Sequence, residues 1–170
     1  CLVDICDSME IEMEQVNKVS QLLRSILIGQ EPDKLLLLKH MGDGYLAVYN
    51  STLAAVSASE RLLEWQAGQQ NIYSADIRIA LDCGITHRTH GHDRSGIPIC
   101  RASRIEKPQK NDIALADGDL QSLKSRNRCL LTQQVTNVLK MEGHEPYTYI
   151  GKRSLKGFSN EMHAIYQYLP

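Results

Sequence analysis

Residues 34–50, K-L-L-L-L-K-H-M-G-D-G-Y-L-A-V-Y-N, decide the fold that the sequence predicts. Two apolar runs, 35–38 and 45–49, flank a Gly-Asp-Gly turn, and apolar runs of this length bounded by turn residues predict paired strands. The glycines allow a sharp turn, so the pattern predicts a β-hairpin that holds the Asp43 carboxylate at its tip. The same pattern is compatible with a hairpin whose turn has no other role.

Residues 1–8, C-L-V-D-I-C-D-S, predict a short buried strand that carries Asp4. A buried acid costs several kcal/mol unless it is paired or binds a metal. If this strand lies beside the hairpin, Asp4 and Asp43 face each other and repel unless a divalent cation sits between them. Carboxylate oxygens suit Mg²⁺ or Mn²⁺, which take further ligands from water and phosphate. The sequence therefore predicts a site for two metal ions that act in phosphoryl transfer.

Composition indicates one globular domain over residues 1–170, with 42% hydrophobic and 23% charged residues. The formal net charge of -1 gives no reason to expect a nucleic-acid or anionic-membrane partner. Five cysteines without a C-x-x-C pair favour the reducing cytoplasm over a disulfide framework. No apolar run is long enough for a membrane span. Because the sequence begins inside a strand and without Met, we expect further residues upstream of it.

The order of elements predicts an α+β fold. After the first strand, Ser8 is placed to cap a helix over 9–27, the hairpin follows, and then come a helix over 52–66 and a strand within 72–83. This βαββαβ order is ferredoxin-like, with an antiparallel sheet, helices mainly on one face, and a bare face left for a site or partner.

The rest of the chain is less informative. The sequence predicts further elements as follows: a helix over 97–106, a strand over 111–116, a helical surface over 121–143, and strands over 147–150 and 163–169. Asp7 could be a third metal ligand, a helix cap or a source of repulsion toward phosphate, and a cap is favoured. His87, His90 and His92 lack a cysteine or carboxylate at zinc-site spacing, so a solvated or phosphate-facing loop is favoured there.

Four motifs occur in a fixed order along the chain: Asp4-Ile5-Cys6-Asp7-Ser8-Met9, Lys39-His40-Met41-Gly42-Asp43, D-R-S-G-I-P-I-C-R-A-S-R over 93–104, and Leu155-Lys156-Gly157-Phe158. Together they resemble the catalytic domain of the class III nucleotidyl cyclases, the adenylate and guanylate cyclases of bacterial type. The resemblance covers nearly the whole chain, and it implies the same α+β fold.

The resemblance implies a reaction and roles for residues. A nucleoside triphosphate, with ATP favoured, would be converted to its 3′,5′-cyclic monophosphate and pyrophosphate. Two Mg²⁺ or Mn²⁺ ions would be held at Asp4, Ile5 and Asp43. Arg104 would stabilise charge on the α-phosphate, as a forked and permanently charged side chain can, and Lys156 would meet the terminal phosphates.

Base selection in this family implies that Lys39 and Asp93 read adenine, one as donor and one as acceptor. Bacterial antiviral defence cyclases that make cyclic UMP or cyclic CMP are similar, so a pyrimidine substrate stays open. Cys100 stands where the family has an asparagine that orients the ribose, and a thiol is a poor hydrogen bonder. A catalytically inactive dimerising or nucleotide-sensing module therefore also stays open.

The resemblance also implies a partner. In this family the metal-binding acids come from one subunit, and the base, arginine and lysine contacts come from the other. Since one chain here carries both sets, the resemblance implies a head-to-tail homodimer with two equivalent sites.

Overall fold

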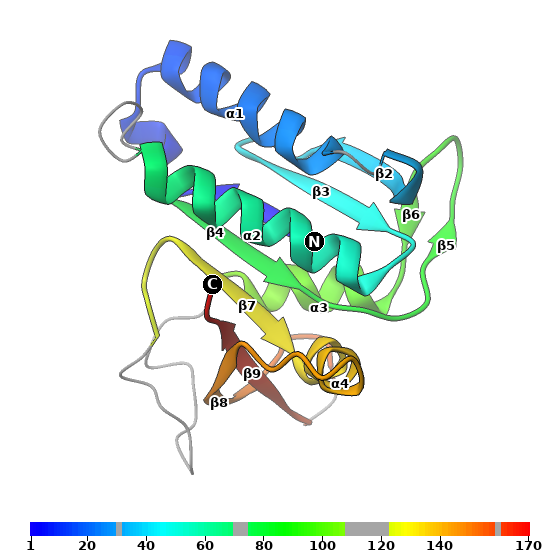
Figure 1. The fold of residues 1–170 in the computed structure, drawn as a ribbon. Helices are drawn as coiled ribbons and strands as arrows, with labels where there is room; N and C mark the ends of the chain where they lie inside the picture. The colour runs from blue at the N-terminus through cyan, green and yellow to red at the C-terminus, as the bar shows by residue number, and fades with distance from the viewer. Residues whose placement is uncertain (30–31, 70–74, 108–122, 159–160) are drawn as a thin grey trace.

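The computed structural model describes residues 1–29, 32–69, 75–107, 123–158 and 161–170. The elements are β1 (Leu2–Ile5), η1 (Ser8–Glu10), α1 (Met13–Ile28), η2 (Pro32–Lys34), β2 (Leu35–His40), β3 (Gly44–Tyr49), α2 (Thr52–Gln69), β4 (Ile77–Leu81), β5 (His87–Arg88), β6 (Arg94–Ser95), α3 (Ile97–Ile105), β7 (Arg128–Thr132), α4 (Gln133–Met141), β8 (Tyr147–Ser154) and β9 (Met162–Tyr168). The strands and longer helices up to β4 follow the predicted βαββαβ order (Figure 1). Within the described ranges, none of the helices combines the length and apolar character that a membrane crossing needs.

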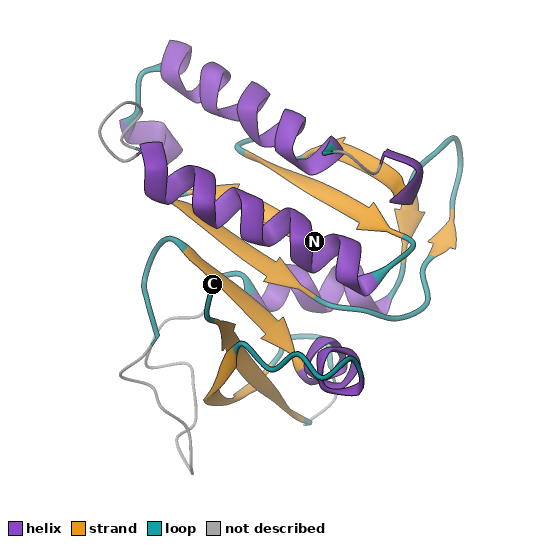
Figure 2. Ribbon diagram, viewed as in Figure 1, coloured by secondary structure: helices purple, strands orange, loops and turns teal. Residues whose placement is uncertain are grey.

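The main sheet has seven strands in the order β2-β3-β1-β4-β7-β9-β8. Neighbouring strands are antiparallel except for β4 and β7, which are parallel. Strands β5 and β6 form a separate small hairpin. Figure 2 shows the helices and this sheet as distinct layers. The predicted α+β class with a mostly antiparallel sheet is confirmed.

The two faces of the sheet carry different side chains, because successive residues of a strand point to opposite sides. Val3 and Ile79 belong to the larger buried core, which includes residues of α1, α2 and α4. Ala80 and Leu130 belong to a smaller core on the other face, together with Ala102 of α3. Figure 1 shows α1 and α2 in front of the sheet and α3 behind it. The second face was predicted to be bare, but α3 covers part of it.

The prediction of a helical surface over 121–143 is wrong in its central part. Residues 128–132 form β7, which is buried throughout and lies between β4 and β9. A strand covered on both faces has no polar alternation, so its apolar run does not distinguish it from a helix. Asn127 sets its register, since its backbone is left-handed (φ 51°) and its Oδ1 accepts from the Ile77 N–H at 2.9 Å. The predicted strand over 111–116 lies outside the described residues.

The start of the first helix also differs from the prediction. The chain forms η1 after β1, and α1 begins only at Met13, so Ser8 caps no long helix. The Ser8 hydroxyl donates instead to Asp43 Oδ2 at 2.9 Å. Asp7, favoured as a cap, makes no capping hydrogen bond and forms an ion pair with Arg126. Its left-handed backbone (φ 50°) turns the chain between β1 and η1.

Candidate active site

The tip of the β2–β3 hairpin lies directly against β1. Gly44 is the register partner of Asp4, and a Cβ added to Gly44 would lie 2.0 Å from the Val3 carbonyl oxygen. Only glycine permits this approach, because real Cβ atoms do not come within 3.0 Å of another heavy atom. The Ile5 N–H donates to the Asp43 carbonyl at 3.1 Å. The structure thus brings the three positions predicted to bind metal into one place.

The Asp4 and Asp43 carboxylates interact with each other. Asp4 is only 7% exposed, whereas Asp43 is half-buried at the turn. Burial would raise the pKa of Asp43, but hydrogen bonds with Ser8 and Asp4 outweigh it and leave that pKa lowered. Two carboxylates near each other repel, and a cation placed between them relieves that repulsion. This pair of hard oxygen donors fits Mg²⁺ or Mn²⁺, with the remaining ligands coming from water and phosphate.

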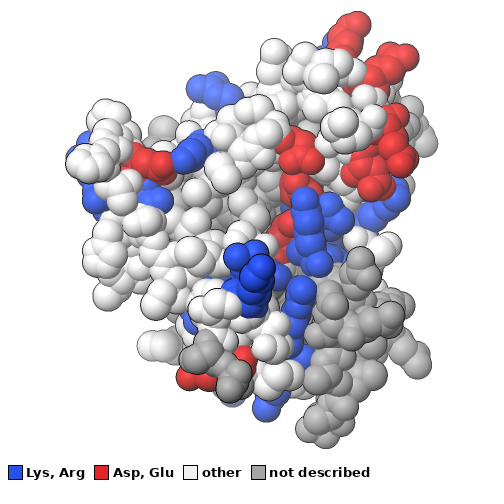
Figure 3. Space-filling model, turned by 180° about the vertical axis from the view of Figure 1, so that it is seen from behind, with Lys and Arg blue, Asp and Glu red and all other residues white. Residues whose placement is uncertain are grey.

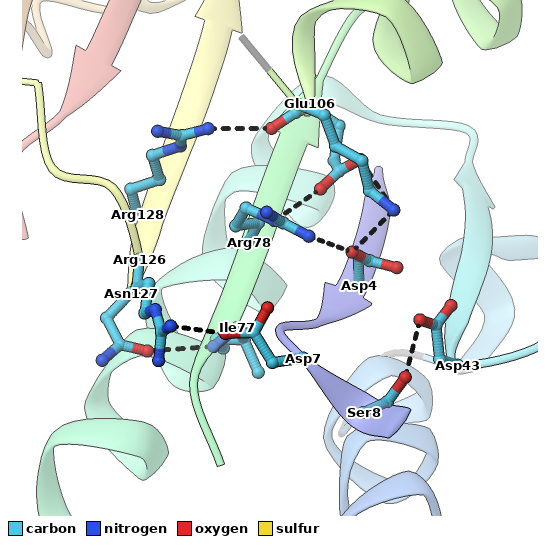
Figure 4. Close-up of polar contacts among 11 residues, drawn as sticks. Asp4, Asp7, Ser8, Asp43, Ile77, Arg78, Glu106, Arg126, Asn127 and Arg128 are labelled. Atoms are coloured by element: carbon cyan, nitrogen blue, oxygen red, sulfur yellow. Dashed lines mark hydrogen bonds and ion pairs between the residues drawn. The ribbon is translucent and has the colours of Figure 1, made fainter. Parts of the chain in front are cut away.

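Two cationic side chains that the sequence analysis missed also contact Asp4. Arg78 Nη2 lies 2.7 Å from Asp4 Oδ2, and Lys107 Nζ lies 3.1 Å from the same oxygen. Arg78 is the register partner of Asp4 across β1 and β4, and the two side chains point toward each other (Figure 4). Both lie on the face that α3 covers, because the strand neighbours of Arg78, Ile77 and Ile79, belong to the core on the other face. The alternation in I-R-I-A-L was a usable signal, because it turns Arg78 away from the side of Ile77 and Ile79.

Glu106 extends this network, and it is 3% exposed. Its Oε1 lies 2.9 Å from Arg78 Nε, and its carbonyl oxygen accepts from Arg128 Nη2 at 3.1 Å. Burial raises the pKa of Glu106 to about 7, and the Asp4 carboxylate adds to that rise. On the face seen in Figure 3, basic and acidic side chains meet in one band. The guanidinium of Arg78 thus holds Asp4 and Glu106 together.

A second group joins β2 to the small β5–β6 hairpin. Lys39 Nζ lies 2.5 Å from Asp93 Oδ2, and the Arg94 N–H donates to Asp93 Oδ1 at 2.8 Å. The hydrogen bond from Lys39 lowers the pKa of Asp93. Both side chains are well exposed, so their outer faces are open to a ligand. The structure thus brings together the two residues predicted to read the base.

Helix α3 carries Cys100 and Arg104 one turn apart, and both are exposed. The helix is anchored by Arg101, whose Nε donates at 2.6 Å to the carboxylate of Asp82, a side chain that is fully buried. Arg153 of β8 donates to the Arg104 carbonyl at 3.1 Å.

Lys156 is exposed in the turn that follows β8. Across the parts of the chain that the structure describes, no hydrogen bond or ion pair joins the side chain of Cys100, Arg104 or Lys156 to Asp4 or Asp43. Within the described part of one chain, therefore, these three residues have no direct polar contact with the two acids.

The histidines of the β5–β6 region do not gather into a ligand set. Among the described residues, no three His, Cys, Asp or Glu side chains are placed to hold one metal ion together. His92 Nδ1 instead lies 2.8 Å from Arg88 Nη2. Within the described residues, a metal bound at Asp4 and Asp43 would therefore find no third side chain of these four kinds.

Solved structures show which proteins share this fold, whereas the sequence matches no protein-family model and no curated protein. An adenylate/guanylate cyclase/hydrolase from Silicibacter pomeroyi superposes with a TM-score of 0.70 at 18% identity, covering 99% of this chain and 95% of that one. The adenylyl cyclase CyaB from P. aeruginosa superposes with a TM-score of 0.63 at 18% identity, covering 99% of this chain and 91% of that one. The guanylate cyclase domain of RhGC from Catenaria anguillulae, in complex with GTP, superposes with a TM-score of 0.64 at 16% identity, covering 98% of this chain and 92% of that one. The chain has the fold of the class III adenylate and guanylate cyclase catalytic domains.

Proposed function

We propose that this protein is a nucleotide cyclase that converts a nucleoside triphosphate, ATP by preference, into its 3′,5′-cyclic monophosphate and pyrophosphate. The observation that carries the proposal is the buried Asp4 beside Asp43 at a hairpin tip, in a fold shared with adenylate and guanylate cyclases. In the reaction the ribose 3′-oxygen bonds to the α-phosphorus while the bond from that phosphorus to the pyrophosphate oxygen breaks. The hydroxyl proton passes to solvent.

Asp4 and Asp43 would hold Mg²⁺ or Mn²⁺, with the main chain at Ile5 beside them. When bound, two such ions supply positive charge that eases loss of the hydroxyl proton and stabilises the departing phosphates. Arg78 offers its fixed guanidinium to the phosphates from the same side, because Asp4 and Glu106 hold it in place. This chain's acids and cations thus orient the triphosphate for in-line attack.

The other half of the site comes from a second copy of the chain. Arg104 would stabilise charge on the α-phosphate, and Lys156 would meet the terminal phosphates. Both are exposed and make no contact with Asp4 or Asp43 of their own chain in the described residues. A head-to-tail homodimer would place them against the acids of the partner and create two equivalent sites.

The Lys39–Asp93 pair favours adenine. In this proposal Lys39 donates to a ring nitrogen and Asp93 accepts from the exocyclic amine. Their pairing at 2.5 Å supports this by fixing donor and acceptor side by side before the base arrives. Cys100 is exposed on α3 and would leave the ribose with one polar contact fewer. The loss of that contact would weaken substrate binding by about 1–3 kcal/mol.

The test is incubation of the protein with each of the four ribonucleoside triphosphates and Mn²⁺, followed by mass analysis of the products. Wild-type protein should form mainly cyclic AMP. Lys39→Glu combined with Asp93→Cys should lower ATP turnover and raise the relative use of GTP, because the donor and acceptor for adenine are lost. Lys140→Glu, on the exposed side of α4, is the matched surface control and should leave base preference unchanged.

The alternatives give different results in the same experiment. Preference for UTP or CTP would overturn the base assignment and keep the cyclase. Absence of a cyclic product from all four triphosphates would overturn the cyclase and favour a nucleotide-sensing or dimerising module.

A further inference from the structure

Lys107 is a residue that none of the cyclase motifs assigns, yet it contacts the centre of the candidate site. It follows α3 by two residues, and its Nζ lies 3.1 Å from Asp4 Oδ2 and 3.9 Å from Glu106 Oε2. Its charge also helps to lower the pKa of Asp43. Lys107 is therefore directed at Asp4, one of the two acids proposed to bind metal.

Lys107 is the movable partner of Asp4, and Arg78 is the fixed one. The Lys107 side chain is 56% exposed, whereas that of Arg78 is 22% exposed and is held between two acids from a central strand. A lysine carries its charge on a flexible stem and is easily redirected. Burial would lower the pKa of Lys107, but its hydrogen bond to Asp4 and the charge of Glu106 raise it, so the side chain stays charged.

The Asp4 carboxylate already has cationic partners without any added ion. Arg78 and Lys107 both contact its Oδ2, at 2.7 Å and 3.1 Å. A divalent ion that bound alone would have to approach the buried Asp4 carboxylate against the positive charge of these two side chains, which is unfavourable. A triphosphate that arrives with the ion brings the opposite charge and gives Lys107 a new partner.

We propose that Lys107 is a resident counter-ion that holds Asp4 until nucleotide arrives, and that it then moves from Asp4 to the triphosphate. This inference rests on the proposed metal site at Asp4 and Asp43. It makes Lys107 a substrate-binding residue and predicts that Mn²⁺ and nucleotide bind together. Lys107 thus suppresses metal binding to the empty site.

The experiment measures Mn²⁺ binding by electron paramagnetic resonance of the free ion, with no turnover required. Wild type, Lys107→Met and the surface control Lys140→Met are titrated with Mn²⁺ alone and with Mn²⁺ plus 3′-deoxy-ATP, which lacks the attacking hydroxyl. Lys107→Met should bind Mn²⁺ alone about tenfold more tightly than wild type, because the competing ammonium is gone. It should bind 3′-deoxy-ATP about tenfold more weakly, because the phosphate contact is lost. Lys140→Met should match wild type in both titrations.

The outcomes separate this inference from the proposed function. If wild type binds Mn²⁺ with nucleotide but Lys107→Met binds Mn²⁺ alone no more tightly than wild type does, the role of Lys107 is overturned and the cyclase proposal stands. Unchanged nucleotide affinity in Lys107→Met would overturn the movement to the triphosphate. If wild type binds no Mn²⁺ even with nucleotide, both proposals fail.

Discussion

Replacing Arg78 by methionine should destabilise the folded protein, because Asp4 and Glu106 lose a cationic partner. Arg78 contacts Asp4 at 2.7 Å and Glu106 at 2.9 Å, both closer than Lys107 does, and its side chain is only 22% exposed. Removing one partner of a buried ion pair costs about 3–5 kcal/mol, because the remaining charge is left without compensation. Lys107 still reaches Asp4 in the variant, so we expect the lower end, about 3 kcal/mol. Chains of this size would then melt about 6–12 °C lower.

Urea denaturation followed by circular dichroism at pH 9 measures this loss, because the pKa of Glu106 is raised to about 7 and its carboxylate is ionised at the higher pH. The second substitution Glu106→Gln, made in the Arg78→Met background, should recover a large part of it at pH 9, because the most buried uncompensated charge disappears. It should recover less at pH 7, where Glu106 takes up a proton once Arg78 is gone. Arg24→Met, on the exposed side of α1, is the matched control and should stay within about 0.5 kcal/mol of wild type. An Arg78→Met variant as stable as wild type, or a double variant no better than the single one, would refute the reasoning.

Two further predictions concern the shared site and the hairpin tip. Asp43→Asn and Arg104→Ala should each be inactive. An equal mixture of the two variants should regain about a quarter of wild-type activity, because half of the dimers are mixed and each mixed dimer holds one intact site. No recovery of activity in dimers shown to be mixed would refute a shared site. Gly44→Ala should abolish turnover, because the added Cβ would lie 2.0 Å from the Val3 carbonyl oxygen and would push the hairpin away from β1. The Cβ of Gly42→Ala meets nothing within 4 Å. That variant should lose only about 1–2 kcal/mol of folding free energy, from its left-handed backbone. Equal activities of the two alanine variants would contradict the role given to Gly44.

The sequence was informative where one residue type has one physical use. The Gly-Asp-Gly turn predicted the hairpin, and the structure adds the reason for the second glycine, which is the close approach of Gly44 to β1. A buried acid predicts a partner, and Asp4 has two. The sequence could not identify Arg78 and Lys107 as these partners, because register across strands and the path after α3 fix them.

The sequence was least informative where burial hides the pattern. Strand β7 is covered on both faces, so its C-L-L run carries no alternation to mark it as a strand. Ser8 and Asp7 have the residue types of helix caps, but tertiary partners take their side chains, Asp43 for one and Arg126 for the other. Local propensity predicted the helix, and long-range contacts decided where it begins.

The central claim is that the ribose 3′-hydroxyl displaces pyrophosphate within one nucleotide. The most direct measurement is phosphorus NMR of the protein with ATP and the diamagnetic ion Mg²⁺, run in parallel with 3′-deoxy-ATP. The account predicts cyclic AMP and pyrophosphate from ATP in a one-to-one ratio, and neither a cyclic product nor pyrophosphate from 3′-deoxy-ATP. Release of ADP and orthophosphate from ATP, or of pyrophosphate from 3′-deoxy-ATP, would contradict it.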